Sequence, residues 1–145
     1  MTALETAFAR EPLFLLEGAL GERLKREYGL DISGPIAMAG LVREPAGRAA
    51  LAALWRQYAA VAARYRLPFL ATTPTRRANR ARMAEAGADA ALIAENVAFL
   101  KAVLHGAGTL SFAGGLMGCR GDAYTGAAAL SRCAGEHLPA PLCGA

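Results

Sequence analysis

Three loops of the sequence carry residue types that suit the binding of a small zwitterion. Each loop follows a short apolar run, and together the loops offer an acid, hydroxyl groups and glycine-rich backbone. A carboxylate accepts hydrogen bonds from an amino group, while backbone N–H groups donate to a carboxyl group. The candidate binding residues in these loops are Glu17, Gly18, Thr72, Thr73, Arg120 and Asp122.

The apolar runs that precede these loops indicate the strands that must position them. Residues 13–16 are continuously apolar and predict a fully buried strand, and residues 67–71 and 109–113 predict two more. Helical patterns alternate with these strands at residues 20–28, 46–66, 79–86, 90–105 and 127–138, after a leading helix at 2–10. Such alternation is typical of parallel β/α units, whose strands end at a common edge. We therefore expect the three loops to meet at that edge.

The helix expected over residues 46–66 has an apolar face with helical spacing and carries the only tryptophan, Trp55. We interpret this tryptophan as a packing anchor. The predicted buried face consists of Leu51, Leu54, Trp55, Tyr58, Val61, Ala62 and Tyr65.

Composition limits the class of protein. The 145 residues fit a single domain over 1–145, and a hydrophobic content of 54% argues against disorder. The sequence shows neither a bilayer-length apolar run nor a secretory signal, so we expect a cytoplasmic protein without a membrane partner. The odd cysteine count, three, favours reduced thiols.

Three features have alternative interpretations. Arg76, Arg77, Arg80 and Arg82 account for part of the +4 net charge and could bind phosphate, but a solvated helix face is the simpler explanation, and nothing else favours nucleic acid. Cys133, His137 and Cys143 are spaced as a possible set of metal ligands. Free thiols and a histidine at the end of a helix are the simpler explanation, and we assign no metal site. Glu17 itself could simply cap the following helix.

Three motifs, in order, resemble those of the homocysteine S-methyltransferase family. Residues 17–24, Glu-Gly-Ala-Leu-Gly-Glu-Arg-Leu, resemble its opening D-G-G-L-G-T-E-L, with Glu17 in place of Asp and Ala19 in place of the second Gly. Residues 70–79 resemble its threonine-rich turn leading to Arg-Ala-Asn. Residues 118–124 resemble its G-P-R-G-D-G-Y loop, with Cys119 in place of proline.

The resemblance implies an α/β fold, a partial (β/α)8 TIM-barrel-like arrangement of about three parallel β/α units. It also implies transfer of a methyl group from an onium-type donor to the thiol of homocysteine, with Glu17 helping to hold the amino acid. In the family zinc binds that thiol through cysteines of later strands, two of them adjacent, and this chain has no adjacent cysteine pair. The resemblance therefore covers only the family's N-terminal portion.

An active protein of this kind needs a complementing chain, since a homo-oligomer completes the sheet without restoring the adjacent thiols. The alternative interpretation is a non-catalytic remnant or an oligomerising interaction module, because a three-stranded sheet exposes its edges. A basic phosphate binder that uses the arginine cluster is the third hypothesis.

Overall fold

The structure is a computed structural model that describes residues 1–117, and it has an α/β fold. The elements along the chain are α1 (Ala3–Arg10), β1 (Leu15–Leu16), α2 (Leu20–Tyr28), the 3-10 helix η1 (Ala37–Arg43), α3 (Pro45–Arg64), β2 (Phe69–Thr72), α4 (Arg80–Glu85), α5 (Ala91–Leu104) and β3 (Ser111–Gly114). The loop at residues 118–124 and the helix predicted over 127–138 lie outside the described residues.

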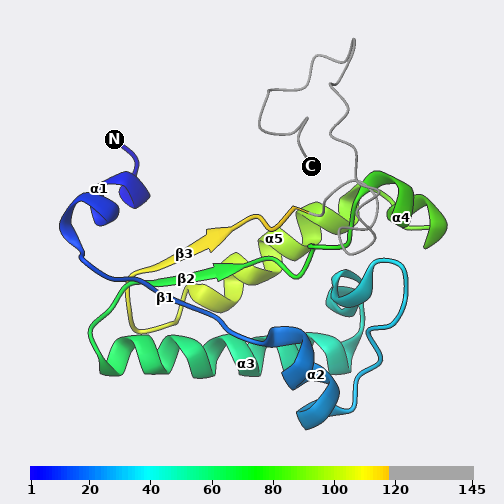
Figure 1. The fold of residues 1–145 in the computed structure, drawn as a ribbon, viewed down its shortest axis with the longest axis horizontal. Coiled ribbons are helices and arrows are strands. Elements are labelled where there is room, and N and C mark those ends of the chain that lie inside the picture. The colour runs from blue at the N-terminus through cyan, green and yellow to red at the C-terminus, as the bar shows by residue number, and fades with distance from the viewer. Residues whose placement is uncertain (118–145) are drawn as a thin grey trace, which may run out of the picture.

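The strands form one parallel sheet in the order β1-β2-β3 (Figure 1). Leu16 is level with Leu70 of the central strand, and Leu70 is level with Phe112 of β3. The prediction of a parallel three-stranded sheet with helical crossovers is confirmed. Because all the strands run in one direction, their carboxyl ends share one edge.

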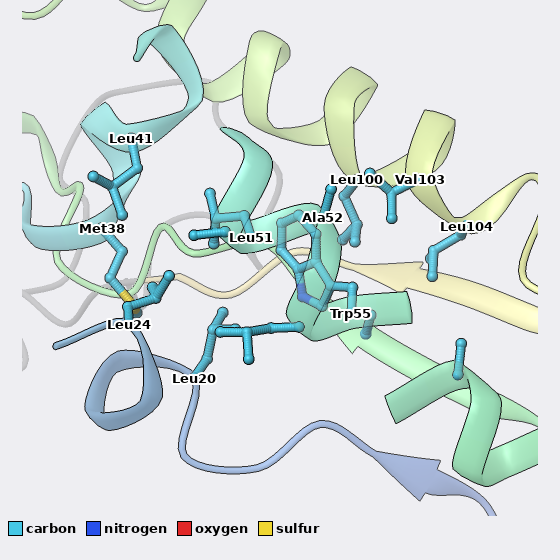
Figure 2. Close-up of a cluster of buried hydrophobic side chains, with 14 of the residues drawn as sticks. Leu20, Leu24, Met38, Leu41, Leu51, Ala52, Trp55, Leu100, Val103 and Leu104 are labelled. Atoms are coloured by element: carbon cyan, nitrogen blue, oxygen red, sulfur yellow. The ribbon is translucent and has the colours of Figure 1, made fainter. Parts of the chain in front are cut away.

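Helices α3 and α5 pack together on the same face of this sheet. Phe69 and Ala71 of β2 point toward the helices and are fully buried. Trp55 of α3 is also fully buried, and its ring lies 5.9 Å from that of Phe99 on α5. Figure 2 shows Trp55 surrounded by leucines from several elements, which confirms its role as a packing anchor.

Helix α2 begins and ends as predicted. It closes at Gly29, which has a left-handed φ of 63° and donates its N–H to the carbonyl groups of Leu24 and Lys25. Glycine adopts this conformation without steric cost, so it commonly ends helices.

Within residues 1–117 no helix combines the length and apolar character required to span a membrane.

Two predictions about burial are wrong. The first strand is not fully buried: it pairs over Leu15–Leu16 only, and Leu16 is 53% exposed. Among the strands of residues 1–117 it lies at the edge of the sheet with one neighbouring strand, which explains the exposure. Val61 and Tyr65 of the predicted buried face are 46% and 63% exposed, because α3 buries only the stripe that contacts the sheet and α5.

Candidate functional site

The carboxylate of Glu17 lies against Thr72 at the carboxyl edge of the sheet. The backbone N–H of Thr72 donates to Oε1 and Oε2 of Glu17 at 2.8 Å and 2.9 Å, and the Thr72 hydroxyl donates to Oε1. Glu17 follows β1 directly and Thr72 is the last residue of the adjacent strand β2, which explains how two groups 55 positions apart in sequence meet. The expected convergence of these two loops is confirmed.

This contact rules out the capping interpretation of Glu17. The residue that precedes α2 is Ala19, and within residues 1–117 no side-chain capping bond is made at the N-terminus of this helix. A carboxylate has about four acceptor positions. Thr72 accounts for three bonds to this carboxylate, and the backbone N–H of Glu17 supplies a further one.

The environment of Glu17 makes its carboxyl group a weaker acid than usual. The side chain is half-buried, and this desolvation raises the pKa of Glu17 above its ordinary value of 4.5. The hydrogen bonds from Thr72 act in the opposite direction but do not cancel the effect of burial. A cationic group bound beside the carboxylate would restore part of the stabilisation that water no longer provides.

The turn between Glu17 and α2 is held in an uncommon conformation. Ala19 has a left-handed φ of 46°, a region that L-residues with a side chain avoid. The carbonyl oxygen of Gly18 accepts a hydrogen bond from the hydroxyl of Tyr58, on α3. The turn is therefore fixed from the helix layer, and no side chain of the described residues caps the first N–H groups of α2.

The second threonine has a structural role in the loops. Thr73 is 2% exposed, and its hydroxyl lies 2.7 Å from that of Thr75. The N–H of Leu116 donates to the Thr73 hydroxyl at 3.1 Å, and the Thr75 hydroxyl donates to the Leu116 carbonyl oxygen at 2.6 Å. These bonds join the loop after β2 to the loop after β3.

A cavity of about 320 Å³ opens beside Glu17. Its lining combines carboxylates, cationic side chains, the first turn of α2 and apolar side chains of the 30–38 connection. The lining residues are Glu17, Gly18, Ala19, Leu20, Gly21, Glu22, Lys25, Ile32, Met38, Thr72, Thr73, Pro74, Arg76 and Leu116. A volume of this order lies at the small end of the range for ligand pockets.

The structure thus places Glu17, Gly18, Thr72 and Thr73 around one cavity, while Arg120 and Asp122 lie outside the described residues. Sequence reasoning missed Tyr58 as the residue that fixes the turn. It also assigned Arg76 only to a basic cluster, although its place after the threonine-rich loop could have put it at this edge. Of that cluster, Arg76 and Arg80 are exposed, whereas Arg77 and Arg82 are half-buried.

The zinc that the resemblance implies does not fit the described part of this site. Among the described residues, the acidic side chains that line the cavity are Glu17 and Glu22, and none of these residues adds a thiol or an imidazole. Throughout residues 1–117 no group of three or more potential ligands gathers. All three cysteines, and His137, fall outside the described residues.

Comparison with known proteins gives no assignment. No protein-family model, curated protein or solved structure matches this chain.

Proposed function

We propose that this chain binds a small amino acid, homocysteine, in the cavity beside Glu17. The observation that carries the proposal is the half-buried Glu17 carboxylate, oriented by Thr72 and lining a cavity of about 320 Å³. In this arrangement the ammonium group of the amino acid donates to Oε2 of Glu17. Charge-assisted hydrogen bonds of this kind are about twice as strong as neutral ones.

The remaining parts of an amino acid also have complementary groups in the lining. The carboxylate of the ligand is matched by the uncapped first turn of α2 and by the guanidinium group of Arg76. Ile32 and Met38 offer an apolar surface to an unbranched side chain. Burial of a thiol or thioether there costs little, because sulfur is only weakly polar.

The resemblance to homocysteine S-methyltransferases extends the proposal to methyl transfer. The left-handed Ala19 supports it, since the family motif has glycine at this position and glycine is favoured in that conformation. The three parallel β/α units agree with part of a (β/α)8 barrel, which has eight strands and about 250 residues. We propose that this chain supplies the amino-acid site and that a complementing chain supplies the rest of the barrel and the adjacent cysteines.

Calorimetric titration of the full chain with a matched ligand series tests the amino-acid site. We expect homocysteine and methionine to bind, and 4-mercaptobutanoate, which lacks the amino group, to bind at least tenfold more weakly. Homocysteine methyl ester, which lacks the charged carboxylate, reports on the first turn of α2 and Arg76. Equal affinity for homocysteine and 4-mercaptobutanoate would refute the assignment of Glu17 to the ammonium group.

The methyl-transfer part of the proposal has a separate test. We expect methionine to form from homocysteine and S-methylmethionine or S-adenosylmethionine only after a chain with the later strands and adjacent cysteines is added. Turnover by this chain alone would contradict the need for a complementing chain.

A further inference from the structure

The turn between β1 and α2 carries a constraint at each of its three residues. The carboxylate of Glu17 accepts hydrogen bonds from Thr72. The carbonyl oxygen of Gly18 accepts one from the hydroxyl of Tyr58. Ala19 has the left-handed φ of 46°, which is unfavourable for a residue with a side chain. The turn therefore keeps its shape only because contacts from outside it oppose the strain at Ala19.

Tyr58 acts on this turn from a distance. It lies on α3 and is not one of the described residues that line the cavity. Its hydroxyl reaches the backbone of Gly18, the residue that follows Glu17 and comes two positions before Leu20, the first residue of α2. Any effect of Tyr58 on a ligand in the cavity must therefore pass through the turn.

Arg23 of α2 contacts the same tyrosine. Its guanidinium carbon lies 5.2 Å from the centre of the Tyr58 ring, which is a cation–π contact. The guanidinium group also donates to Glu27 at 2.6 Å and 2.8 Å, and to Oε1 of Gln57 at 2.6 Å. Gln57 is the neighbour of Tyr58 on α3. Arg23 therefore joins α2 to α3 at the position from which Tyr58 reaches the turn.

The conformation of Ala19 decides how the two polar ends of the cavity face each other. Its φ is the torsion about the N–Cα bond, so it orients the peptide group of Gly18 relative to α2. Glu17 precedes this peptide group and the first turn of α2 follows it. In the proposed function the ammonium group of the ligand binds Glu17 and the carboxylate of the ligand faces the first turn of α2. A change of φ at Ala19 would alter the spacing between these two groups.

We propose that Tyr58 is the positioning residue of the amino-acid site, because its hydrogen bond to Gly18 holds the strained turn and sets the spacing between the Glu17 carboxylate and the first turn of α2. The effect on a ligand rests on the proposed function, whereas the effect on the turn needs no ligand. A ligand that uses both of its charged groups requires this spacing. A ligand with only one charged group does not.

Tyr58→Phe tests the proposal by calorimetric titration with homocysteine and its methyl ester. The substitution removes the hydroxyl and keeps the ring that contacts Arg23, so the variant should stay folded, which circular dichroism checks. The strain of a left-handed alanine corresponds to about a 5- to 30-fold bias against the native turn, and homocysteine affinity should fall by about this factor. The methyl ester, which lacks the charged carboxylate, should lose much less affinity.

Tyr65→Phe is the matched control. Tyr65 follows α3 directly and is 63% exposed. Its replacement should leave both affinities unchanged. Unchanged homocysteine affinity in Tyr58→Phe would overturn the proposal. An equal loss for homocysteine and its methyl ester would also overturn it, because Tyr58 would then support the fold without setting the spacing.

A second substitution in Tyr58→Phe tests whether strain is what the hydroxyl opposes. Ala19→Gly should restore most of the homocysteine affinity, since glycine adopts a left-handed φ without steric cost. Ala37→Gly is the control for this rescue, because Ala37 is also left-handed, with a φ of 47°, but lies outside the turn. It should restore nothing. Rescue by both substitutions, or by neither, would contradict a specific link between Tyr58 and Ala19.

A carbon-13 NMR titration of the Glu17 carboxyl group tests the turn without a ligand. Burial raises the pKa of Glu17 above 4.5, and the bonds from Thr72 only partly oppose this. In Tyr58→Phe the relaxed turn should expose the carboxyl group, so its pKa should move toward 4.5. An unchanged pKa in Tyr58→Phe would refute the proposal whether or not the chain binds homocysteine. A shifted pKa in a chain that binds no homocysteine would refute the proposed function and leave only the effect of Tyr58 on the turn.

Discussion

Replacement of Glu17 by glutamine tests the binding site most directly. The amide keeps the size of the side chain, and its oxygen can still accept the bonds from the Thr72 N–H and hydroxyl that reach Oε1. It removes the negative charge and one acceptor. The variant therefore changes what the cavity offers an ammonium group, with little change in shape.

The structure gives the expected size of two separate effects. Loss of a hydrogen bond between an ammonium group and a carboxylate costs about 1.5–3 kcal/mol, which lowers the affinity for homocysteine about 10- to 150-fold. Folding stability should change by less than about 1 kcal/mol, because the lost bond to Oε2 is offset by removal of a half-buried charge. For a chain of this length that corresponds to a shift in Tm of only about 2–4 °C.

Calorimetric titration with homocysteine, together with thermal unfolding, measures both effects on the same sample. Glu22→Gln is the control, because Glu22 lines the same cavity but is exposed and paired with Lys25 at 3.2 Å. Glu17→Asp keeps the charge and should retain more affinity than Glu17→Gln. If Glu17→Gln binds homocysteine as tightly as the parent while Glu22→Gln loses affinity, the assignment of Glu17 is wrong.

The remaining predictions concern pH and the backbone. Burial raises the pKa of Glu17, so the folded chain holds this proton to higher pH than the unfolded chain. The free energy of unfolding should therefore fall as pH rises from about 4.5 through the folded pKa of Glu17, and then level off. Denaturant unfolding at a series of pH values measures this fall, and the Glu17→Gln variant should lack the part of it that Glu17 causes. Homocysteine affinity should rise over the same window, because only the ionised carboxylate attracts the ammonium group; constant affinity in titrations across that window would count against the site. Ala19→Gly should stabilise the chain by about 0.5–1 kcal/mol in urea unfolding, since it relieves the left-handed φ of 46°; destabilisation would show that this turn is not strained. Gly47→Ala should cost about 1–3 kcal/mol in the same assay, because an added Cβ would lie 2.6 Å from the Leu41 carbonyl oxygen, and an unchanged midpoint would contradict that close packing.

Much of the fold follows from local patterns in the sequence. The apolar runs before Glu17 and Thr72 mark two of the strands, and helical spacing predicts α2, α3 and α5 close to their observed bounds. Gly29 ends α2 as expected. These features depend on side-chain periodicity and on the conformational freedom of glycine, both of which are properties of short segments.

Only the tertiary structure decided how the candidate site is assembled. The sequence placed Glu17 and Thr72 at one edge of the sheet but gave no sign that the carboxylate accepts bonds from the backbone and hydroxyl of Thr72. It also gave no sign that Tyr58 fixes the turn or that Leu16 is exposed. A hydrogen bond between distant residues depends on the register and packing of whole elements, and the exposure of an apolar side chain depends on what lies across the sheet from it. Neither quantity is encoded in a short stretch of sequence.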